Sequence, residues 1–154
     1  MSKENADKEQ KRSFKREVFS WIACIVVTIL LTEFILNFVI INANIPSGSM
    51  ENTIMTNDKL IALRTSYWFN DPKRGDIIIF KYPDDETEWF IKRVIALPGE
   101  TVLVKDGKVY INGSKKALSE PYIKEEPVED FGPYKVPKNG YFVMGDNRNN
   151  SNDA

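Results

Sequence analysis

Apolar and polar side chains are distributed very unevenly along the chain. Residues 1–17 are rich in lysine and glutamate and show no apolar periodicity, which predicts a flexible, solvated tail. Residues 18–41 are almost wholly apolar, and Glu33 is the only charged side chain among them. At roughly 1.5 Å per residue, a helix of this length crosses a bilayer core of about 30 Å. The pattern therefore predicts a single transmembrane helix over residues 18–41.

Two other interpretations of this apolar segment fit less well. A buried core helix would carry a continuous polar face, and the polar side chains here are too few to form one. A cleaved export signal has an apolar core of about 7 to 15 residues that ends in small residues, whereas Asn42 and Asn44 flank the small Ala43. We therefore expect an uncleaved anchor. Glu33 needs no functional role, because it can be protonated, pair with a neighbouring helix or lie near the interface.

The placement of charge predicts how this anchor is oriented. Residues 1–17 hold six Lys or Arg against four Asp or Glu, and several of the basic residues lie just before the apolar segment. The positive-inside rule then predicts a cytoplasmic N-terminus. The chain from about residue 42 onward is expected on the extracytoplasmic side.

Beyond residue 42 the pattern changes to short apolar runs separated by turn-forming residues. It predicts strands over residues 58–64, 76–80 and 141–144, a strand-like run over residues 88–100 with a turn at 97–100, and a hairpin over residues 102–111 with Asp-Gly at its centre. The proline-rich, acidic residues 117–137 are expected to be irregular. The sequence thus predicts a mainly β fold, in which residues 42–154 form one antiparallel β-rich domain with no βαβ rhythm. The aromatic residues 67–69 suit either core packing or the membrane interface.

Composition excludes several kinds of active site. The 154 residues include no histidine and only one cysteine, Cys24, so a Ser-His-Asp triad, a Cys-His dyad and a zinc site built on His or Cys are excluded. A hydrolase with a covalent step would need a lysine or a carboxylate as its base. The net charge is only −1, which gives no basic face for nucleic acid.

Ser49 and Lys92 are the candidates for such chemistry. Ser49 lies in a proline-containing loop, and strand alternation places Lys92 on the same face as Phe90 and Val94. A lysine acts as a general base only where apolar surroundings lower its pKa from the usual value of about 10.4. The pattern alone leaves an ordinary turn serine and a solvated strand lysine as alternatives.

Four sequence motifs favour the catalytic interpretation of Ser49 and Lys92. They are Pro-Ser-Gly-Ser-Met at 46–50, directly after the anchor, Gly-Asp-Ile-Ile-Ile-Phe at 75–80, Phe-Ile-Lys-Arg-Val-Ile-Ala-Leu-Pro-Gly-Glu at 90–100, and Met-Gly-Asp-Asn-Arg-Asn-Asn-Ser-Asn-Asp at 144–153. In this order and context they resemble the bacterial type I signal peptidases, which are serine proteases with a Ser-Lys dyad. The resemblance covers the chain from its anchor to its last residues.

The resemblance implies roles for individual residues. Ser49 matches the nucleophile of the family and Lys92 its general base, while Ser47, with the backbone N–H of Ser49, matches the oxyanion hole. Ser151 matches a hydroxyl that orients the lysine amine. A structural role in supporting the motif loops is implied for Arg93, Asp146, Asn147, Arg148 and Asp153. No cofactor or metal is implied.

The resemblance also implies partners and a location. The family removes signal peptides from exported preproteins that carry small side chains at the first and third positions before the cut, and it works at the cell membrane. The implied partners are these preproteins and the lipid bilayer, with the secretion translocon as a further candidate and no nucleic acid.

The end of the chain opens a second interpretation of its function. The last motif of the family continues into a further strand, so we expect the domain of this chain to be cut short at its C-terminus. The first alternative is thus a truncated, catalytically inactive membrane-tethered β-domain that binds exported chains. A second, the self-cleaving repressor proteases with a related Ser-Lys arrangement, carries a DNA-binding segment that is not visible here.

Overall fold

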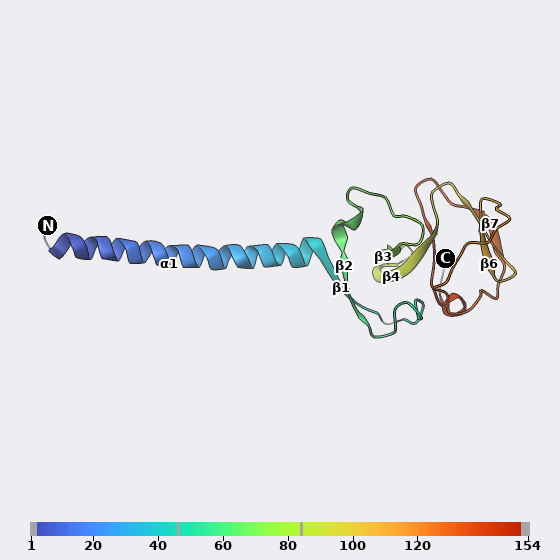
Figure 1. Ribbon diagram of the computed structural model, residues 1–154, viewed down its shortest axis with the longest axis horizontal. Coiled ribbons are helices and arrows are strands. Elements are labelled where there is room, and N and C mark those ends of the chain that lie inside the picture. The colour runs from blue at the N-terminus through green and yellow to red at the C-terminus, as the bar shows by residue number, and fades with distance from the viewer. Residues whose placement is uncertain (1–2, 46, 84, 152–154) are drawn as a thin grey trace. The chain divides into compact units, whose positions relative to one another are not determined.

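The chain divides into two compact units, a helical one and a β-rich one. The computed structural model describes residues 3–45, 47–83 and 85–151 (Figure 1). Helix α1 spans Lys3–Phe34, and a π-helical turn, η1, continues it over Ile35–Val39. The prediction of a flexible tail over residues 1–17 is therefore wrong from Lys3 onward. Lysine, glutamate, glutamine, alanine and arginine are strong helix formers, and a stretch rich in them extends the apolar helix toward the N-terminus.

The apolar part of this helix meets the requirements of a membrane span. Phe14–Val39 has a mean hydropathy of 2.4, and its most apolar window is not buried against other parts of the structure. The segment ends before the predicted boundary at residue 41, because Ile40 already begins the first strand. The Glu33 carboxylate accepts a hydrogen bond of 3.1 Å from Asn37 Nδ2, one turn further along.

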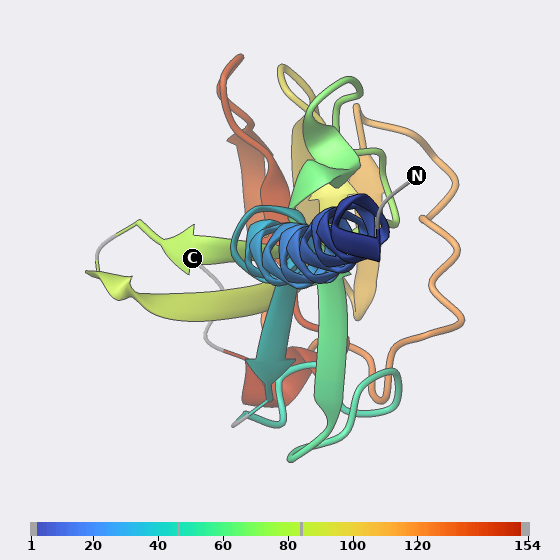
Figure 2. The same cartoon turned by 90° about the vertical axis from the view of Figure 1, so that its left-hand side faces the viewer.

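The β-rich unit is built from short antiparallel strands, as predicted. Strands β1 and β2 form a pair, β3, β4 and β8 form a second sheet with β4 in the centre, and β6, β5 and β7 form a third with β5 in the centre. The β3–β4 hairpin extends away from the other strands in Figure 2. The strands are Ile40–Asn44 (β1), Lys59–Leu63 (β2), Ile77–Tyr82 (β3), Asp85–Ala96 (β4), Thr101–Lys105 (β5), Lys108–Ile111 (β6), Phe131–Lys135 (β7) and Phe142–Met144 (β8).

Two strands were missed by the sequence pattern. Strand β1 follows directly on the apolar segment, and its residues alone do not distinguish a strand from the end of a helix. Strand β7 lies within residues 117–137, which were expected to be irregular. It contains Gly132 and Pro133, two residues that normally argue against a strand, and it pairs only at the edge of its sheet, where proline is tolerated.

The core lies in two clusters that surround β4. One cluster contains Ile95 and Ala96 at the end of β4 and the apolar residues of β5, β6 and β8. The other contains Ile45, Met50, Ile54 and Ile91. The aromatic residues after β2 do not join either cluster, since Trp68 is 61% exposed and Phe69 is 89% exposed. Core packing is therefore ruled out for these two side chains.

Candidate active site

The loop that carries Ser49 is fixed by its own turns and by one buried side chain. Glu51 N donates to Gly48 O at 3.1 Å, and Ile54 N donates to Met50 O at 2.8 Å. Met50 is fully buried, so the residue next to Ser49 anchors the loop in the core. Ser49 itself is only 7% exposed. Ser47 Oγ lies 3.3 Å from Ser49 Oγ, within hydrogen-bond range.

Lys92 is a buried lysine in the middle of β4. It is 3% exposed, and its Nζ lies 5.7 Å from the centre of the Phe90 ring on the same face of the strand. Strand β4 is flanked by β3, where Ile78 pairs with Lys92, and by β8 from Arg93 onward. The neighbours Ile91 and Arg93, which point to the opposite face of β4, are buried as well. Both faces of the strand are therefore covered at this point, and Lys92 is not the solvated strand lysine that the pattern left open.

One pocket brings the candidate residues together. Its volume is about 450 Å³, and Ser47, Ser49 and Lys92 all line it. Most of the remaining wall is apolar, with Ile45 and Ile79 among its residues. Met50, which lies beside Ser49 in the sequence, is absent from this lining because it is buried beneath the loop. A serine hydroxyl and a lysine amine therefore open onto the same partly apolar space.

Ser151 lies against the lysine amine. Lys92 Nζ and Ser151 Oγ form a hydrogen bond, although the two residues are 59 positions apart. The segment that carries Ser151 also connects to the Ser49 loop, because Asn147 N, just before the η3 turn (Arg148–Asn150), donates to Ser49 O at 2.9 Å. The lysine, its hydroxyl partner and the Ser49 loop are thus linked through polar contacts.

Gly145 lies at the point of closest approach between these segments. A Cβ added there would overlap the Ser49 carbonyl oxygen and the Ser151 hydroxyl, and would lie 2.8 Å from Ser151 Cβ. The Ser49 oxygen belongs to the backbone, and Ser151 Cβ is attached to it. A change of side-chain rotamer therefore relieves neither of these two contacts. Only glycine fits this position.

We expect Gly145→Ala to lower the rate of any reaction at the Ser49 pocket by about 100-fold, because small displacements at an active site have costs of this size. Overpacking should also destabilise the β-rich unit by about 1–3 kcal/mol. Gly140→Ala is the matched control, since its nearest neighbours would lie 3.9 Å from the new Cβ. Turnover and the thermal midpoint, measured for both variants, check the prediction. Equal turnover by the two variants would contradict it.

A buried ion pair between Arg93 and Asp146 connects the segments that carry the candidate residues. Arg93 follows Lys92 on β4 and binds Asp146 with both Nε and Nη2, at 2.8 and 2.6 Å. Asp146 also accepts a hydrogen bond from Thr53 Oγ1 in the Ser49 loop, and Arg93 Nη1 donates to Gly75 O at 2.8 Å. The hydrogen bonds to Asp146 raise the pKa of Arg93, against the opposing effect of burial. The pair and its hydrogen bonds thus join β4 to the Ser49 loop, to the turn at Gly75 and to the segment that carries Asp146.

Asn147 and Arg148 make further connections. Asn147 Nδ2 donates to Gly48 O at 2.9 Å, and Arg148 Nε donates to Gly145 O at 2.9 Å. Arg148 also forms a buried ion pair with Glu120, at 2.6 Å between Nη2 and Oε1. Sequence reasoning missed Glu120, since it lies in the acidic stretch that was read as an irregular excursion. Asp153, a further predicted support residue, lies outside the described residues.

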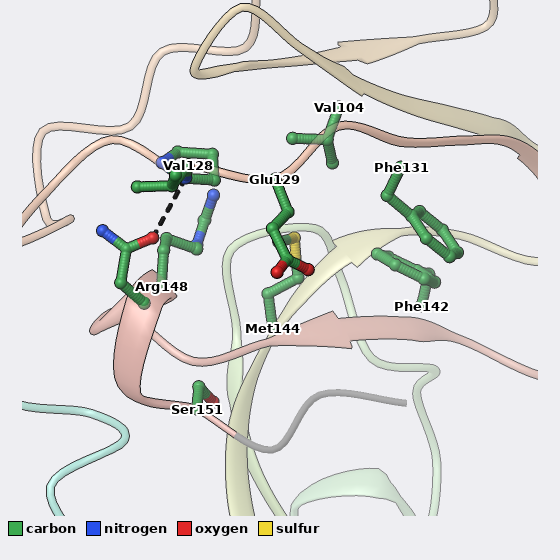
Figure 3. Close-up of a pocket in the computed structure, with 10 residues that line it drawn as sticks. Val104, Val128, Glu129, Phe131, Phe142, Met144, Arg148 and Ser151 are labelled. Carbon is green, nitrogen blue, oxygen red and sulfur yellow. Dashed lines mark hydrogen bonds between the residues drawn. The ribbon is translucent and has the colours of Figure 1, made fainter.

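A second pocket lies on the other side of the Ser151 segment (Figure 3). It has a volume of about 420 Å³, and Figure 3 shows Ser151 and Arg148 at one end and the stacked rings of Phe131 and Phe142 at the other. Asn150 lines the first pocket, while its neighbours Asn149 and Ser151 line the second. The η3 turn therefore separates the two pockets. Within the described part of the chain, no cluster of three His, Cys, Asp or Glu residues is arranged to hold a metal ion.

Comparison with known proteins gives consistent matches. A family profile described as "Signal peptidase, peptidase S26" matches residues 18–154. "Probable signal peptidase I-2" from a Synechocystis species is 46% identical over 134 residues, which are 84% of this chain and 61% of that protein. "Signal peptidase I" from Bacillus amyloliquefaciens is 37% identical over 156 residues, which are 95% of this chain and 82% of that protein.

A solved structure also matches part of the chain. The crystal structure of a signal peptidase I from Enterococcus faecalis is 38% identical and aligns with a TM-score of 0.47, covering 55% of this chain and 84% of that one. The chain spans about three fifths of the length of the Synechocystis relative.

Proposed function

Because the chain belongs to the signal peptidase family, peptidase S26, we propose that it is a membrane-anchored serine endopeptidase that removes signal peptides from exported preproteins. The family assignment agrees with the resemblance that the four sequence motifs carry. The observation that carries the proposed mechanism is the shared pocket of Ser49 and Lys92, in which the lysine is buried and hydrogen-bonded to Ser151.

The proposed reaction begins with proton transfer from Ser49 to Lys92. A general base accepts a proton only as the neutral amine, so the proposed reaction starts from neutral Lys92. The Ser49 alkoxide attacks the carbonyl carbon of the scissile bond and forms a tetrahedral oxyanion. The Lys92 ammonium then gives its proton to the departing amine, which becomes the N-terminus of the mature protein. The signal peptide remains bound to Ser49 Oγ as an ester.

Water completes the cycle. Lys92, again neutral, takes a proton from a water molecule, and the resulting hydroxide attacks the ester carbonyl. The signal peptide leaves with a new carboxylate, and Ser49 regains its proton from Lys92. Ser151 keeps the amine in place through its hydrogen bond in both halves of the reaction. The cycle uses no cofactor.

Ser47 is the proposed side-chain donor of the oxyanion hole, together with the backbone N–H of Ser49. Its Oγ lies 3.3 Å from the nucleophilic oxygen. We expect Ser47→Ala to lower kcat by about 10²- to 10³-fold with little change in KM, because the oxyanion exists only after attack. Steady-state kinetics on a preprotein substrate measure both constants, and Ser47→Thr, which keeps a hydroxyl, should regain part of the lost kcat. A rise in KM at constant kcat would assign Ser47 to substrate binding instead.

The anchor gives the proposed enzyme its location. Phe14–Val39 would hold it in the cell membrane as a single-pass protein, with the basic N-terminal residues in the cytoplasm and the β-rich unit outside. An anchored enzyme meets its substrates in two dimensions, since the apolar part of a signal peptide is itself held in the bilayer. The secretion translocon is a candidate neighbour for the same reason. Protease accessibility in sealed vesicles tests the orientation.

The function is tested with the full chain in detergent and a preprotein that has alanine at the first and third positions before the expected cut. We expect a single new N-terminus, identified by mass spectrometry, directly after the small residue. The matched control is the same preprotein with tyrosine at the position before the cut, which should remain intact. Absence of cleavage of the alanine substrate would overturn the proposal and favour an inactive β-domain that binds exported chains.

A further inference from the structure

A short segment between β6 and β7 contacts every part of the chain that supplies the candidate site. We call residues 120–124 the strap. Its alternate residues Glu120, Tyr122 and Lys124 carry the contacts. The sequence pattern gave this segment no role, and the mechanism above does not use it.

The strap is bonded to the loop that holds Ser49. Asn52 Nδ2 donates to Tyr122 O at 3.1 Å, and Lys124 Nζ pairs with Glu51 Oε2 at 2.9 Å. Glu51 and Asn52 come two and three residues after Ser49. The hydrogen bond and charge of Lys124 lower the pKa of Glu51, so the carboxylate is ionised at neutral pH. The strap is therefore bonded directly to the turn that follows Ser49.

The strap also covers the strand that carries Lys92. The Tyr122 ring lies 3.9 Å from Arg93 Cζ, and Arg93 is the next residue after Lys92. Burial and the neighbouring charge of Glu120 raise the pKa of Tyr122, so its phenol stays protonated and donates to Glu120 Oε1 at 3.0 Å. The Tyr122 ring thus packs against the Arg93 guanidinium, which also binds Asp146, in a cation–π contact.

The third set of contacts reaches the segment that holds Ser151. Glu120 accepts hydrogen bonds from Arg148 Nη2 and Nη1, at 2.6 and 3.3 Å, and the Glu120 and Arg148 side chains are 6% and 0% exposed. Arg148 in turn holds Gly145 O, and Gly145 packs between Ser49 O and Ser151 Oγ. Lys124 N adds a hydrogen bond to Asp146 O at 3.2 Å.

We propose that the strap is a positioning element, in which Glu120 and Tyr122 hold the segments of Ser49, Lys92 and Ser151 in register. The inference rests on the proposed function. Among the described residues, the lining of the Ser49 pocket includes none from the strap, so its side chains act through other residues. Loss of the strap should therefore lower kcat and leave KM nearly unchanged, because it displaces reacting groups without removing a substrate contact.

Two strap variants and two matched controls test this with the full chain in detergent. Tyr122→Leu removes the ring over Arg93 and leaves the ion pair of Glu120 with Arg148 in place, while Glu120→Gln removes the charge of that pair. Tyr134→Leu is the control for a lost tyrosine, since Tyr134 lies on β7 of the third sheet and packs against Phe131 and Phe142, away from the strap. Glu100→Gln is the control for a lost ion pair, since Glu100 lies 2.6 Å from Arg74.

We expect both strap variants to lose kcat by about 10- to 100-fold with KM within about twofold of the parent chain. Both controls should keep the parent kcat, and Ser49→Ala defines the inactive baseline. Hydrogen exchange followed by mass spectrometry gives a second readout that needs no activity. Exchange in segments 47–53 and 145–151 should rise together in Tyr122→Leu and stay unchanged in Tyr134→Leu.

The two proposals fail in different ways. If the parent chain cleaves preprotein and the strap variants keep its kcat, the positioning role is overturned while the proposed function stands. Unchanged exchange at either segment in Tyr122→Leu overturns it as well. If the parent chain cleaves nothing, the proposed function fails, and the exchange measurement alone decides whether the strap holds the three segments.

Discussion

Replacing Lys92 with methionine is expected to abolish preprotein cleavage while leaving the β-rich unit folded. A general base contributes about 10²- to 10⁴-fold to a reaction, and here no histidine is available to take over, so we expect a loss of about 10³-fold or more. Stability should not fall, because Lys92 is 3% exposed and a buried amine is costly to keep away from water. Methionine has nearly the same length and fills the same space. The result would be a stable, inactive protein.

Two measurements, turnover and the thermal midpoint, test this prediction. Turnover is compared for the parent chain, Lys92→Met and Ser49→Ala, and the thermal midpoint is recorded for each. Ser49→Ala should be equally inactive, because it removes the atom that becomes acylated. Lys108→Met is the control, since Lys108 is exposed on β6 and should keep full activity. A Lys92→Met chain that retains a tenth of the parent turnover would rule out Lys92 as the base.

Asp146→Ala is expected to cause the largest loss of stability. Asp146 is fully buried, and its removal leaves the Arg93 guanidinium without a counter-charge at a site where its side chain is only 11% exposed. Breaking a buried ion pair from one side costs about 3–5 kcal/mol. Thr53 Oγ1 loses its acceptor in the same step. Unfolding of the full chain in detergent, followed by tryptophan fluorescence, measures this loss.

Two further variants show whether the loss of stability is specific to the buried pair. Glu100→Ala breaks the pair with Arg74, whose side chains are 28% and 18% exposed, and should cost less than about 1 kcal/mol. The double variant Arg93→Met, Asp146→Leu removes both charges of this pair and leaves neither unpaired, so it should be more stable than Asp146→Ala alone. If Asp146→Ala costs no more than Glu100→Ala, the buried pair does not hold the loops together.

Strands with regular alternation could be predicted from the sequence, and so could the motif residues of the site. The hairpin around Asp106 and Gly107 could be predicted because Asp-Gly tolerates the positive φ that such a turn requires, and both residues have a positive φ in the structure. The burial of Lys92 could not be predicted, since it depends on β3, β8 and the Ser49 loop, which come together only in the fold. Periodicity within β4 contains no information about what covers each face.

The strap shows a different limit of sequence reasoning. Glu120 and Lys124 look like ordinary solvated charges in an acidic, proline-rich stretch, and their partners lie 28 and 73 positions away. No local pattern marks a carboxylate for burial against a distant arginine. Strand β7 was missed for a related reason, because its pairing with β5 overrides the poor strand propensity of Gly132 and Pro133.

The candidate site joins segments that the ribosome synthesises at very different times. Asn147 Nδ2 reaches a carbonyl 99 positions earlier in the chain, and Ser151 lies 59 positions beyond Lys92. Contacts this distant form late, since the chain between them must first be closed into a loop, and a growing chain leaves the ribosome from its N-terminus. We therefore expect a nascent chain to be catalytically inert, with its nucleophile already made, until residues 145–151 have folded back onto the Ser49 loop.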